Sequence, residues 1–168
     1  MSMLNRKSVV LSALAALVCV SLAARADEMA RAQKAIERGD YSIAVVQLKP
    51  LAARGDARAE EALGALYDAG LGVAPDAVRA AKLSREAALQ GSGAAQLNLA
   101  QLYLKGRGVQ ADPVRAYAWA DAAAASGEPG GQDILDRLAK EMPRGQLKRA
   151  QSLAQRYVER YVESFASG

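Results

Sequence analysis

The stretch Leu63–Gly91, LGALYDAGLGVAPDAVRAAKLSREAALQG, returns 36 residues later (63 to 99) as Leu99–Gly127, LAQLYLKGRGVQADPVRAYAWADAAAASG. A fixed period of this size is typical of stacked repeat arrays, in which each unit buries its apolar side only against its neighbours. The sequence therefore favours an array of repeated units, an architecture that points toward binding rather than catalysis. Leu66-Tyr67 recurs as Leu102-Tyr103, and Gly70, Gly72 and Val73 recur as Gly106, Gly108 and Val109. Likewise, Asp76, Arg79 and Ala80 recur as Asp112, Arg115 and Ala116, and Ala87-Ala88 recurs as Ala123-Ala124.

The apolar spacing within each copy is helical. Ala95, Leu99 and Leu102 follow one another at steps of four and three residues, which places them on one face of a helix. Gly106 and Gly108 are expected to end that helix, because glycine readily adopts the positive φ of a helix C-terminus. Each copy therefore begins with a helix that is followed by a glycine loop.

A second helix is predicted after the loop. Asp112 stands directly before Pro113, the usual order of an N-cap and a first helical residue. We expect this helix to run to about Ala125 and to be closed by Gly127, with Trp119 buried among small alanines. Each unit is therefore a helical hairpin.

These motifs resemble the Sel-one-like repeat, a relative of the tetratricopeptide repeat with a longer loop between its helices. The resemblance implies an all-α fold, a right-handed α-solenoid of stacked antiparallel helical hairpins, and it assigns one repeat to residues 57–92 and another to 93–128. It also implies work as an adaptor or scaffold. The motifs that carry it are Leu63-Gly64, Leu66-Tyr67, Gly70-Leu71-Gly72-Val73, Asp76, Ala80 and Ala87-Ala88, and Ala95-Gln96, Leu99-Ala100, Leu102-Tyr103, Gly106-Arg107-Gly108-Val109, Asp112, Ala116, Trp119 and Ala123-Ala124.

The flanks follow the pattern more loosely. Residues 27–56 resemble a tetratricopeptide-like hairpin with a tight turn at Gly39-Asp40, and Pro50 is expected to kink its second helix or end it early. Residues 129–168 form a degenerate repeat in which Met142-Pro143-Arg144 replaces the glycine loop. A long helix is expected from about Pro143 and would cap the array. Its apolar stripe is Leu147, Ala150, Ala154, Tyr157, Tyr161 and Phe165.

Residues 1–26 have the pattern of a cleavable secretory signal peptide. Arg6-Lys7 precedes an apolar stretch that is short for a membrane-spanning helix, and Ala24-Arg25-Ala26 forms a small-x-small cleavage site. An uncleaved anchor is the alternative. Cleavage removes the single Cys19 and three of the 22 basic residues, which leaves 19 against 18 acidic ones. We therefore expect a periplasmic or secreted protein without disulfides, whose high pI is no argument for nucleic-acid binding.

The residue inventory argues against catalysis. The chain has no His, and its one Cys belongs to the expected signal peptide, so His-based acid–base chemistry and thiol nucleophiles are excluded. A metal site would have to consist of carboxylates alone, and the glycine loops lack the sequence context of phosphate loops. We expect Asp76 and Asp112 to be helix caps, and the pairs Glu60-Glu61 and Asp133/Asp136 to be solvated. No catalytic residue, metal site or cofactor is predicted.

The first helices of such arrays line the concave side, where we expect the partner-binding groove. Ala62 of one copy corresponds to Asn98 of the other, and Ala65 to Gln101, so the copies differ at the groove and agree in the core. Such divergence favours a surface that recognises a partner, and solvated helix positions are the alternative. The candidate groove residues are Arg58, Glu61, Leu97, Asn98, Gln101 and Lys105.

The C-terminal helix carries a second candidate patch, in which basic residues lie beside aromatic ones. Anionic envelope lipid, an anionic polymer or an acidic partner protein would suit it, and a capping helix with a solvated basic face is the alternative. If the last turns extend beyond the preceding hairpin, Val158, Tyr161, Val162 and Phe165 are uncovered and would pair two subunits. The patch consists of Arg144, Lys148, Arg149, Arg156, Tyr161 and Phe165.

The sequence thus predicts a non-enzymatic protein–protein interaction module of the bacterial cell envelope. It would bind a peptide or a protein segment in the concave groove. One alternative is a secreted enzyme that acts on peptidoglycan or β-lactam-like substrates, an activity credited to some members of the family it resembles; those chains carry cysteine-paired hairpins, which this chain lacks. The other alternative is a structural homodimer subunit.

Overall fold

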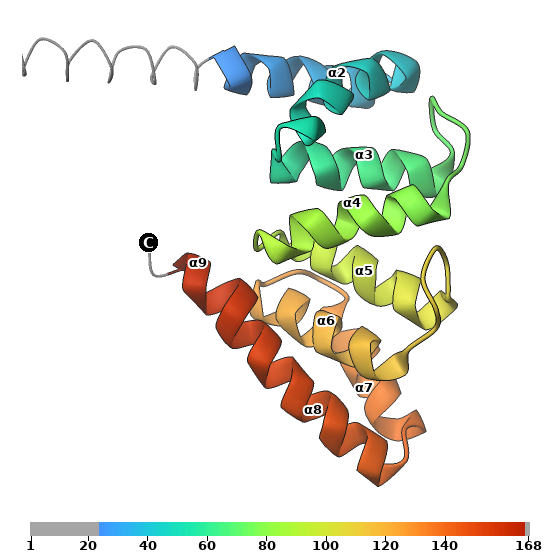
Figure 1. Ribbon diagram of the computed structural model, residues 1–168, viewed down its shortest axis with the longest axis vertical. Helices are drawn as coiled ribbons and strands as arrows, with labels where there is room; N and C mark the ends of the chain where they lie inside the picture. Colours follow the sequence, from blue (N-terminus) through green and yellow to red (C-terminus); the bar gives the residue numbers. More distant parts are fainter. Residues whose placement is uncertain (1–23, 167–168) are drawn as a thin grey trace, which may run out of the picture.

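The computed structural model describes residues 24–166, which fold into an elongated stack of helices (Figure 1). No strand occurs in this part of the chain, so the predicted all-α fold is confirmed. The helical segments are residues 24–37, α2 (Tyr41–Ala53), α3 (Ala57–Ala69), α4 (Ala77–Leu89), α5 (Gly93–Lys105), α6 (Pro113–Ala125), α7 (Gly131–Glu141), α8 (Arg144–Val158), the π-helical turn η1 (Glu159–Glu163) and α9 (Ser164–Ala166).

Each of the two copies is one helical hairpin, with α3 packed on α4 and α5 packed on α6. Both first helices end at a glycine in the left-handed conformation, Gly70 at φ 68° and Gly106 at φ 63°. Both second helices begin at an aspartate, Asp76 or Asp112, whose carboxylate accepts hydrogen bonds from backbone N–H groups of the first turn. The predicted glycine loops and aspartate caps are therefore confirmed.

The second glycine of each loop packs against the preceding unit. Gly72 and Gly108 both have a φ of 69°. A Cβ atom on Gly108 would lie 1.9 Å from the carbonyl oxygen of Ala77, at the start of α4. A Cβ atom on Gly72 would likewise lie 2.3 Å from the carbonyl carbon of Tyr41, at the start of α2. Only glycine allows this approach, so these two positions set how closely successive units stack.

A tyrosine, an arginine and an aspartate are linked in the same way in both hairpins. Tyr103 is only 6 % exposed, and its hydroxyl accepts a hydrogen bond from Nη1 of Arg115 at 3.4 Å. The Nε atom of Arg115 lies 3.3 Å from the carboxylate of Asp112. The same contacts recur 36 residues earlier, among Tyr67, Arg79 and Asp76. The two tyrosines therefore point in equivalent directions, as the repeat predicts.

The N-terminal hairpin differs from the sequence prediction at Pro50. Of the two expected effects of this proline, an early end of the helix is wrong, because α2 continues through Pro50 to Ala53, and a kink stays a prediction. Leu48 and Leu51, on either side of the proline, are completely or almost completely buried, while Pro50 itself is exposed. Packing of these leucines outweighs the one backbone donor that proline removes.

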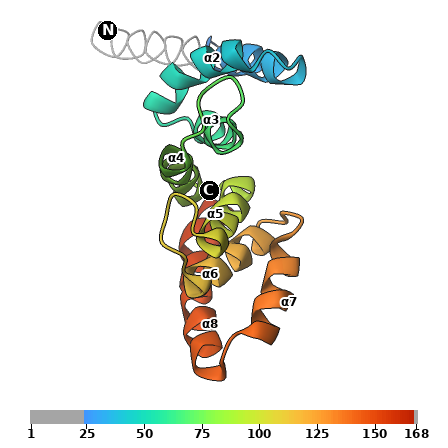
Figure 2. The ribbon, with the colours of Figure 1, turned by 90° about the vertical axis from the view of Figure 1, so that its right-hand side faces the viewer.

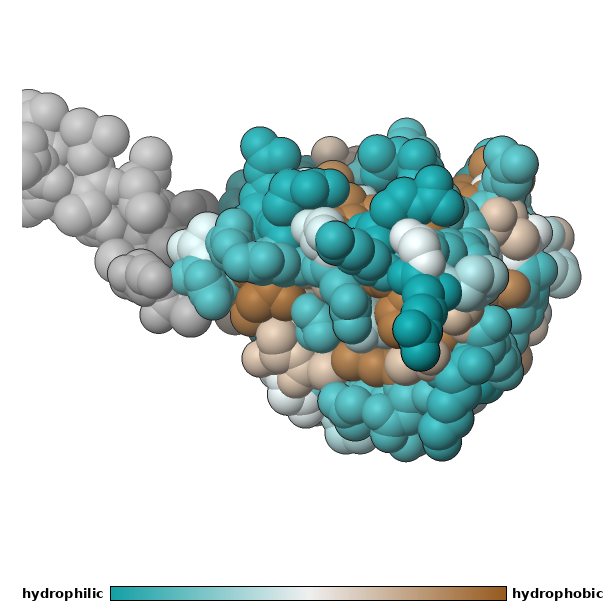
Figure 3. Space-filling model, turned by 90° about the horizontal axis from the view of Figure 1, so that it is seen from below, coloured by the Kyte–Doolittle hydropathy of each residue, from teal (hydrophilic) through white to brown (hydrophobic). Residues whose placement is uncertain are grey.

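The C-terminal helix α8 packs along α6, as a cap on the last regular hairpin. In Figure 2, α7 and α8 diverge from the turn that joins them. Trp119 of α6 is buried, and its ring centroid lies 4.4 Å from that of Tyr157 and 5.4 Å from that of Tyr161. Seen from this end, the surface is mostly hydrophilic with a band of hydrophobic residues (Figure 3). The predicted capping helix is therefore confirmed.

The predicted signal peptide, residues 1–26, lies outside the described residues apart from its last three positions. Among the helices of residues 24–166, none combines the length and the hydropathy that a membrane crossing requires.

Candidate interaction surfaces

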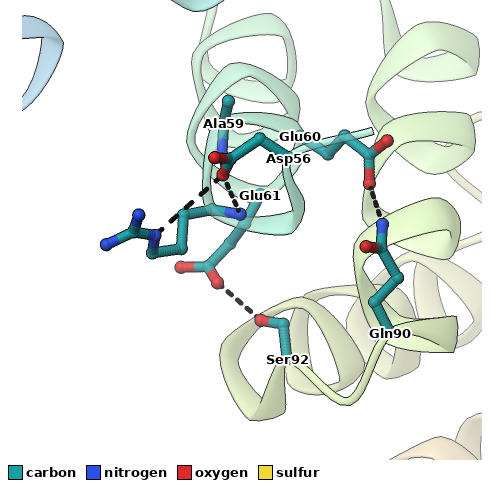
Figure 4. A network of polar contacts seen from close by, with 7 residues as sticks. Asp56, Ala59, Glu60, Glu61, Gln90 and Ser92 are labelled. Carbon is teal, nitrogen blue, oxygen red and sulfur yellow. Dashed lines mark hydrogen bonds and ion pairs between the residues drawn. The ribbon is translucent and has the colours of Figure 1, made fainter. Parts of the chain in front are cut away.

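A polar network joins α3 to the turn between α4 and α5 (Figure 4). One oxygen of Glu60 accepts a hydrogen bond from the amide nitrogen of Gln90 at 2.8 Å, and the neighbouring Glu61 accepts one from the hydroxyl of Ser92. Asp56 caps α3 by accepting hydrogen bonds from two backbone N–H groups of its first turn. The network therefore links the start of α3, in the first repeat, to the start of α5, in the second repeat.

Glu60 was expected to be solvated, and that expectation is wrong. Its side chain faces the interior, and the residue is only 4 % exposed. Burial raises the pKa of Glu60, the negative charges of Glu86 and Asp56 raise it further, and the hydrogen bond from Gln90 acts in the opposite direction. The other predicted acidic pair, Asp133/Asp136, is exposed as expected.

Gln96 occupies in the second repeat the position that Glu60 has in the first. It is completely buried, and its Nε2 atom donates hydrogen bonds of 3.3 Å to the carbonyl oxygens of Ala88 and Tyr161. Its Oε1 atom accepts one of 3.1 Å from the hydroxyl of Ser126. This role was not predicted from the sequence. A usable signal was present, because Glu60 and Gln96 are polar residues 36 positions apart and each directly follows an alanine that is buried, Ala59 or Ala95.

Three of the six predicted groove residues make internal contacts. Asn98 donates a hydrogen bond of 2.8 Å to the hydroxyl of the buried Ser84 on α4. Glu61 contacts Ser92 before α5, and the equivalent Leu97 lies against Gly130 before α7, where a Cβ atom would be 3.6 Å from the leucine side chain. These three side chains therefore help to join neighbouring helices.

The other three predicted groove residues remain available to a partner. Arg58 is exposed, and only Asp56 lies near its guanidinium, at 4.0 Å. Gln101 is half-buried and Lys105 is exposed, and neither has a hydrogen-bond or ion-pair partner within residues 24–166. We call the exposed side of α3, α5 and α7 the first-helix face; its role in binding stays a prediction.

The second predicted patch is divided between surface and core. Tyr161 is half-buried against Trp119 and Val162 packs on the same core, so neither is left uncovered. Phe165 is 56 % exposed, with one ring edge beside Gly91. The patch's basic residues are all exposed and have no ion-pair partner in the described part of the chain: Arg144, Lys148, Arg149 and Arg156.

The described residues contain no group of three or more His, Cys, Asp or Glu side chains that is arranged to hold a metal ion. Asp121 on α6 is half-buried, and burial raises its pKa. It lines a shallow hollow between α6 and α8, together with Glu159 and Glu163.

The stacked hairpins and their repeated loop define a helical-repeat solenoid protein. The Sel1 repeat family profile matches residues 57–92 and 93–128. The chain therefore contains two Sel1 repeats, and the structural likeness given below supports this assignment.

Two solved structures are similar to this chain. One is a protective antigen of uropathogenic Escherichia coli strains that displays an SLR fold, with 30 % identity and a TM-score of 0.79 over 83 % of this chain and 31 % of that one. The other is a Sel1 repeat protein from Oxalobacter formigenes, with 26 % identity and a TM-score of 0.63 over 76 % of this chain and 54 % of that one. The chain thus spans less than two thirds of either relative. No match is found among curated proteins.

Proposed function

We propose that this protein is an exported, non-enzymatic adaptor of the bacterial cell envelope that binds a peptide or a protein segment on its first-helix face. Sel1 repeats are generally protein-interaction modules, which supports the class of function. The signal-peptide pattern of residues 1–26 supports export. The absence of His from the chain supports a role without His-dependent catalysis.

One observation carries the proposed site: the first helices of the two repeats differ at positions that face outward, while their core tyrosines make the same contacts. Gln101 replaces Ala65 of the first repeat and Lys105 replaces Ala69, whereas Tyr103 and Tyr67 make the same internal contacts. Because Gln101 and Lys105 have no internal partner, their hydrogen-bonding groups are free for another molecule. A groove of this length buries about 800 Å² or less of its own surface, which fits a modest affinity.

The test is crosslinking in living cells from a photoreactive residue at position 101, with the same probe at position 148 on α8 as the matched surface control. We expect discrete adducts from position 101 that are missing from position 148 and that weaken when Lys105 is replaced by Ala. Identical adducts from both positions, or adducts that are indifferent to Lys105→Ala, would overturn the first-helix face as the binding site.

Export and the lack of enzymatic activity are tested separately. The mature protein is expected in the periplasmic or secreted fraction, with Asp27 at its N-terminus by mass spectrometry. Purified protein is expected to leave β-lactams and cell-wall fragments unchanged. Turnover that disappears in a Glu61→Gln variant would replace the adaptor proposal with an enzyme.

A further inference from the structure

Two hollows open between successive units, and three of the residues that line one are related by the repeat to three that line the other. The first hollow, about 310 Å³, is lined by Lys49, Tyr67 and Arg79 among others. The second hollow, about 380 Å³, is lined by the residues 36 positions later, Arg85, Tyr103 and Arg115. Each combines a cation from the preceding unit's second helix, α2 or α4, with the tyrosine and the arginine of the next hairpin.

Hydrogen-bond donors converge in each hollow. Lys49 and Arg85 are exposed and have no hydrogen-bond or ion-pair partner within residues 24–166. Across the second hollow, the hydroxyl of Tyr103 accepts from Arg115 and retains its own proton for donation. Arg115 uses Nε for Asp112 and Nη1 for Tyr103, which leaves further N–H groups on its guanidinium. A carboxylate that enters the second hollow would meet two guanidinium groups and a hydroxyl among the residues that line it.

A third tyrosine lies close to the second hollow. The ring of Tyr157, from α8, packs against Trp119 with a centroid distance of 4.4 Å. Burial raises the pKa of Tyr157, while the positive charges of Arg115 and Arg85 act in the opposite direction. The capping helix therefore adds a polar group beside the cations of the second hollow.

The carboxylates around these hollows are already engaged. Asp112 accepts hydrogen bonds from the backbone N–H groups of Val114 and Arg115 as the cap of α6, and Glu86 lies 3.8 Å from the amino group of Lys82 in the first hollow. Lys49 and Arg85 are 36 residues apart, and the position 36 residues after Arg85 is Asp121. Asp121 lines the acidic hollow between α6 and α8. Two cationic hollows are thus followed by an anionic one.

We propose that the two cationic hollows form a second binding surface, which takes the Asp or Glu side chains of an acidic segment of a partner protein. The cations line two separate hollows between helices, an arrangement that suits the individual side chains of an acidic segment better than a flat membrane surface. The acidic hollow between α6 and α8 would repel a uniform polyanion that extended along the whole array. This surface is formed mainly by second helices and loops, with Tyr67 from α3 and Tyr103 from α5, and it shares neither Gln101 nor Lys105 with the first-helix face.

The test uses a fluorescein-labelled peptide of six Glu-Gly repeats and measures its binding to the full mature chain by fluorescence anisotropy. We expect Lys49→Ala and Arg85→Ala each to weaken binding about threefold, and the double variant about tenfold, as for removal of exposed charge pairs. The matched control is Lys148→Ala with Arg149→Ala, which removes the same charge from α8 and is expected to leave binding within a factor of about two. Both double variants keep every hydrogen bond of the folded chain described above.

Two further measurements ask whether the hollows distinguish the acidic peptide from other anions. Inorganic phosphate and vesicles with anionic lipid are expected to bind equally to the wild type and to the Lys49/Arg85 double variant. The proposal is overturned if the α8 control weakens peptide binding as much as the Lys49/Arg85 variant, if neither variant weakens it, or if vesicle binding is what the Lys49/Arg85 variant loses. Crosslinking from position 101 reports on the first-helix face, so failure of one surface is distinguishable from failure of the other.

Discussion

The buried side-chain amide of Gln96 donates a hydrogen bond to the main-chain carbonyl of Tyr161, 3.3 Å away and 65 residues further along the chain. Tyr161 lies in η1, a π-helical turn where the regular α-helical pattern is interrupted. The same amide also donates to Ala88, and its oxygen accepts from Ser126. One side chain therefore joins α5, the ends of α4 and α6, and the C-terminal cap.

Replacement of Gln96 by Leu is expected to destabilise the protein by about 1–3 kcal/mol, because buried carbonyl groups lose their donor. Urea unfolding measures the loss, and hydrogen exchange is expected to show earlier opening of residues 159–166. The control is Gln132→Leu, 36 residues later and exposed on α7, with an expected change within about 0.5 kcal/mol. Equal effects at the two positions would contradict the assigned role of Gln96.

Replacement of Glu60 by Gln is expected to stabilise the protein at neutral pH. Burial raises the folded-state pKa of Glu60 above its ordinary value of 4.5, so its contribution to stability is full below that value and is lost as the pH rises through the folded pKa. The stability difference between Glu60→Gln and wild type should therefore shrink as the pH falls through the folded pKa of Glu60 and be smallest below 4.5. Thermal unfolding across this range measures it, and Glu37→Gln, at an exposed position, should show no such trend.

Gly108→Ala is expected to cost more stability than Gly127→Ala. Both glycines have positive φ, so each substitution carries a strain of about 1–2 kcal/mol. At Gly108 the new Cβ would also collide with the carbonyl oxygen of Ala77, while at Gly127 it would meet nothing within 4 Å. Chemical denaturation of the two variants makes the comparison, and similar losses would mean that the loop does not pack against α4 as described.

Trp119→Ala is expected to lower the free energy of unfolding by about 3–5 kcal/mol, as for other buried large-to-small aromatic substitutions. The ring is 3 % exposed and contacts Tyr157 and Tyr161, so its loss opens a cavity beneath the C-terminal cap. Trp119→Phe is the conservative comparison and should retain much of the stability. A near-neutral Trp119→Ala result, measured by urea unfolding, would mean that the buried side of α6 is misassigned.

Much of the fold follows from local features that a single copy of the repeat contains. The helices, the left-handed Gly70 and Gly106, and the caps Asp76 and Asp112 were all predictable, because each depends on residues within a few positions in the chain. The same phase argument placed Trp119 in the core. Pro50 is the exception, because the burial of Leu48 and Leu51 against other helices outweighs the local preference.

The candidate site was less predictable, because the availability of a side chain depends on helices that are distant in sequence. Asn98 and Gln101 stand three residues apart on α5, yet Asn98 bonds to Ser84 of the preceding unit and Gln101 has no partner within residues 24–166. Glu60 and Glu61 are adjacent, yet one is buried and the other half-buried. The spacing identified the helix face but not which of its side chains are occupied.

By itself, the sequence determined the repeat, its two helices and its loop, because 36-residue periodicity, glycine placement and capping act over short distances in the chain. Only the tertiary structure decided that α8 packs along α6 with Tyr157 and Tyr161 on Trp119, and that Arg85, Tyr103 and Arg115 line one hollow. These relationships arise where separate units meet. They depend on the angle and depth at which helices pack, which no local pattern specifies.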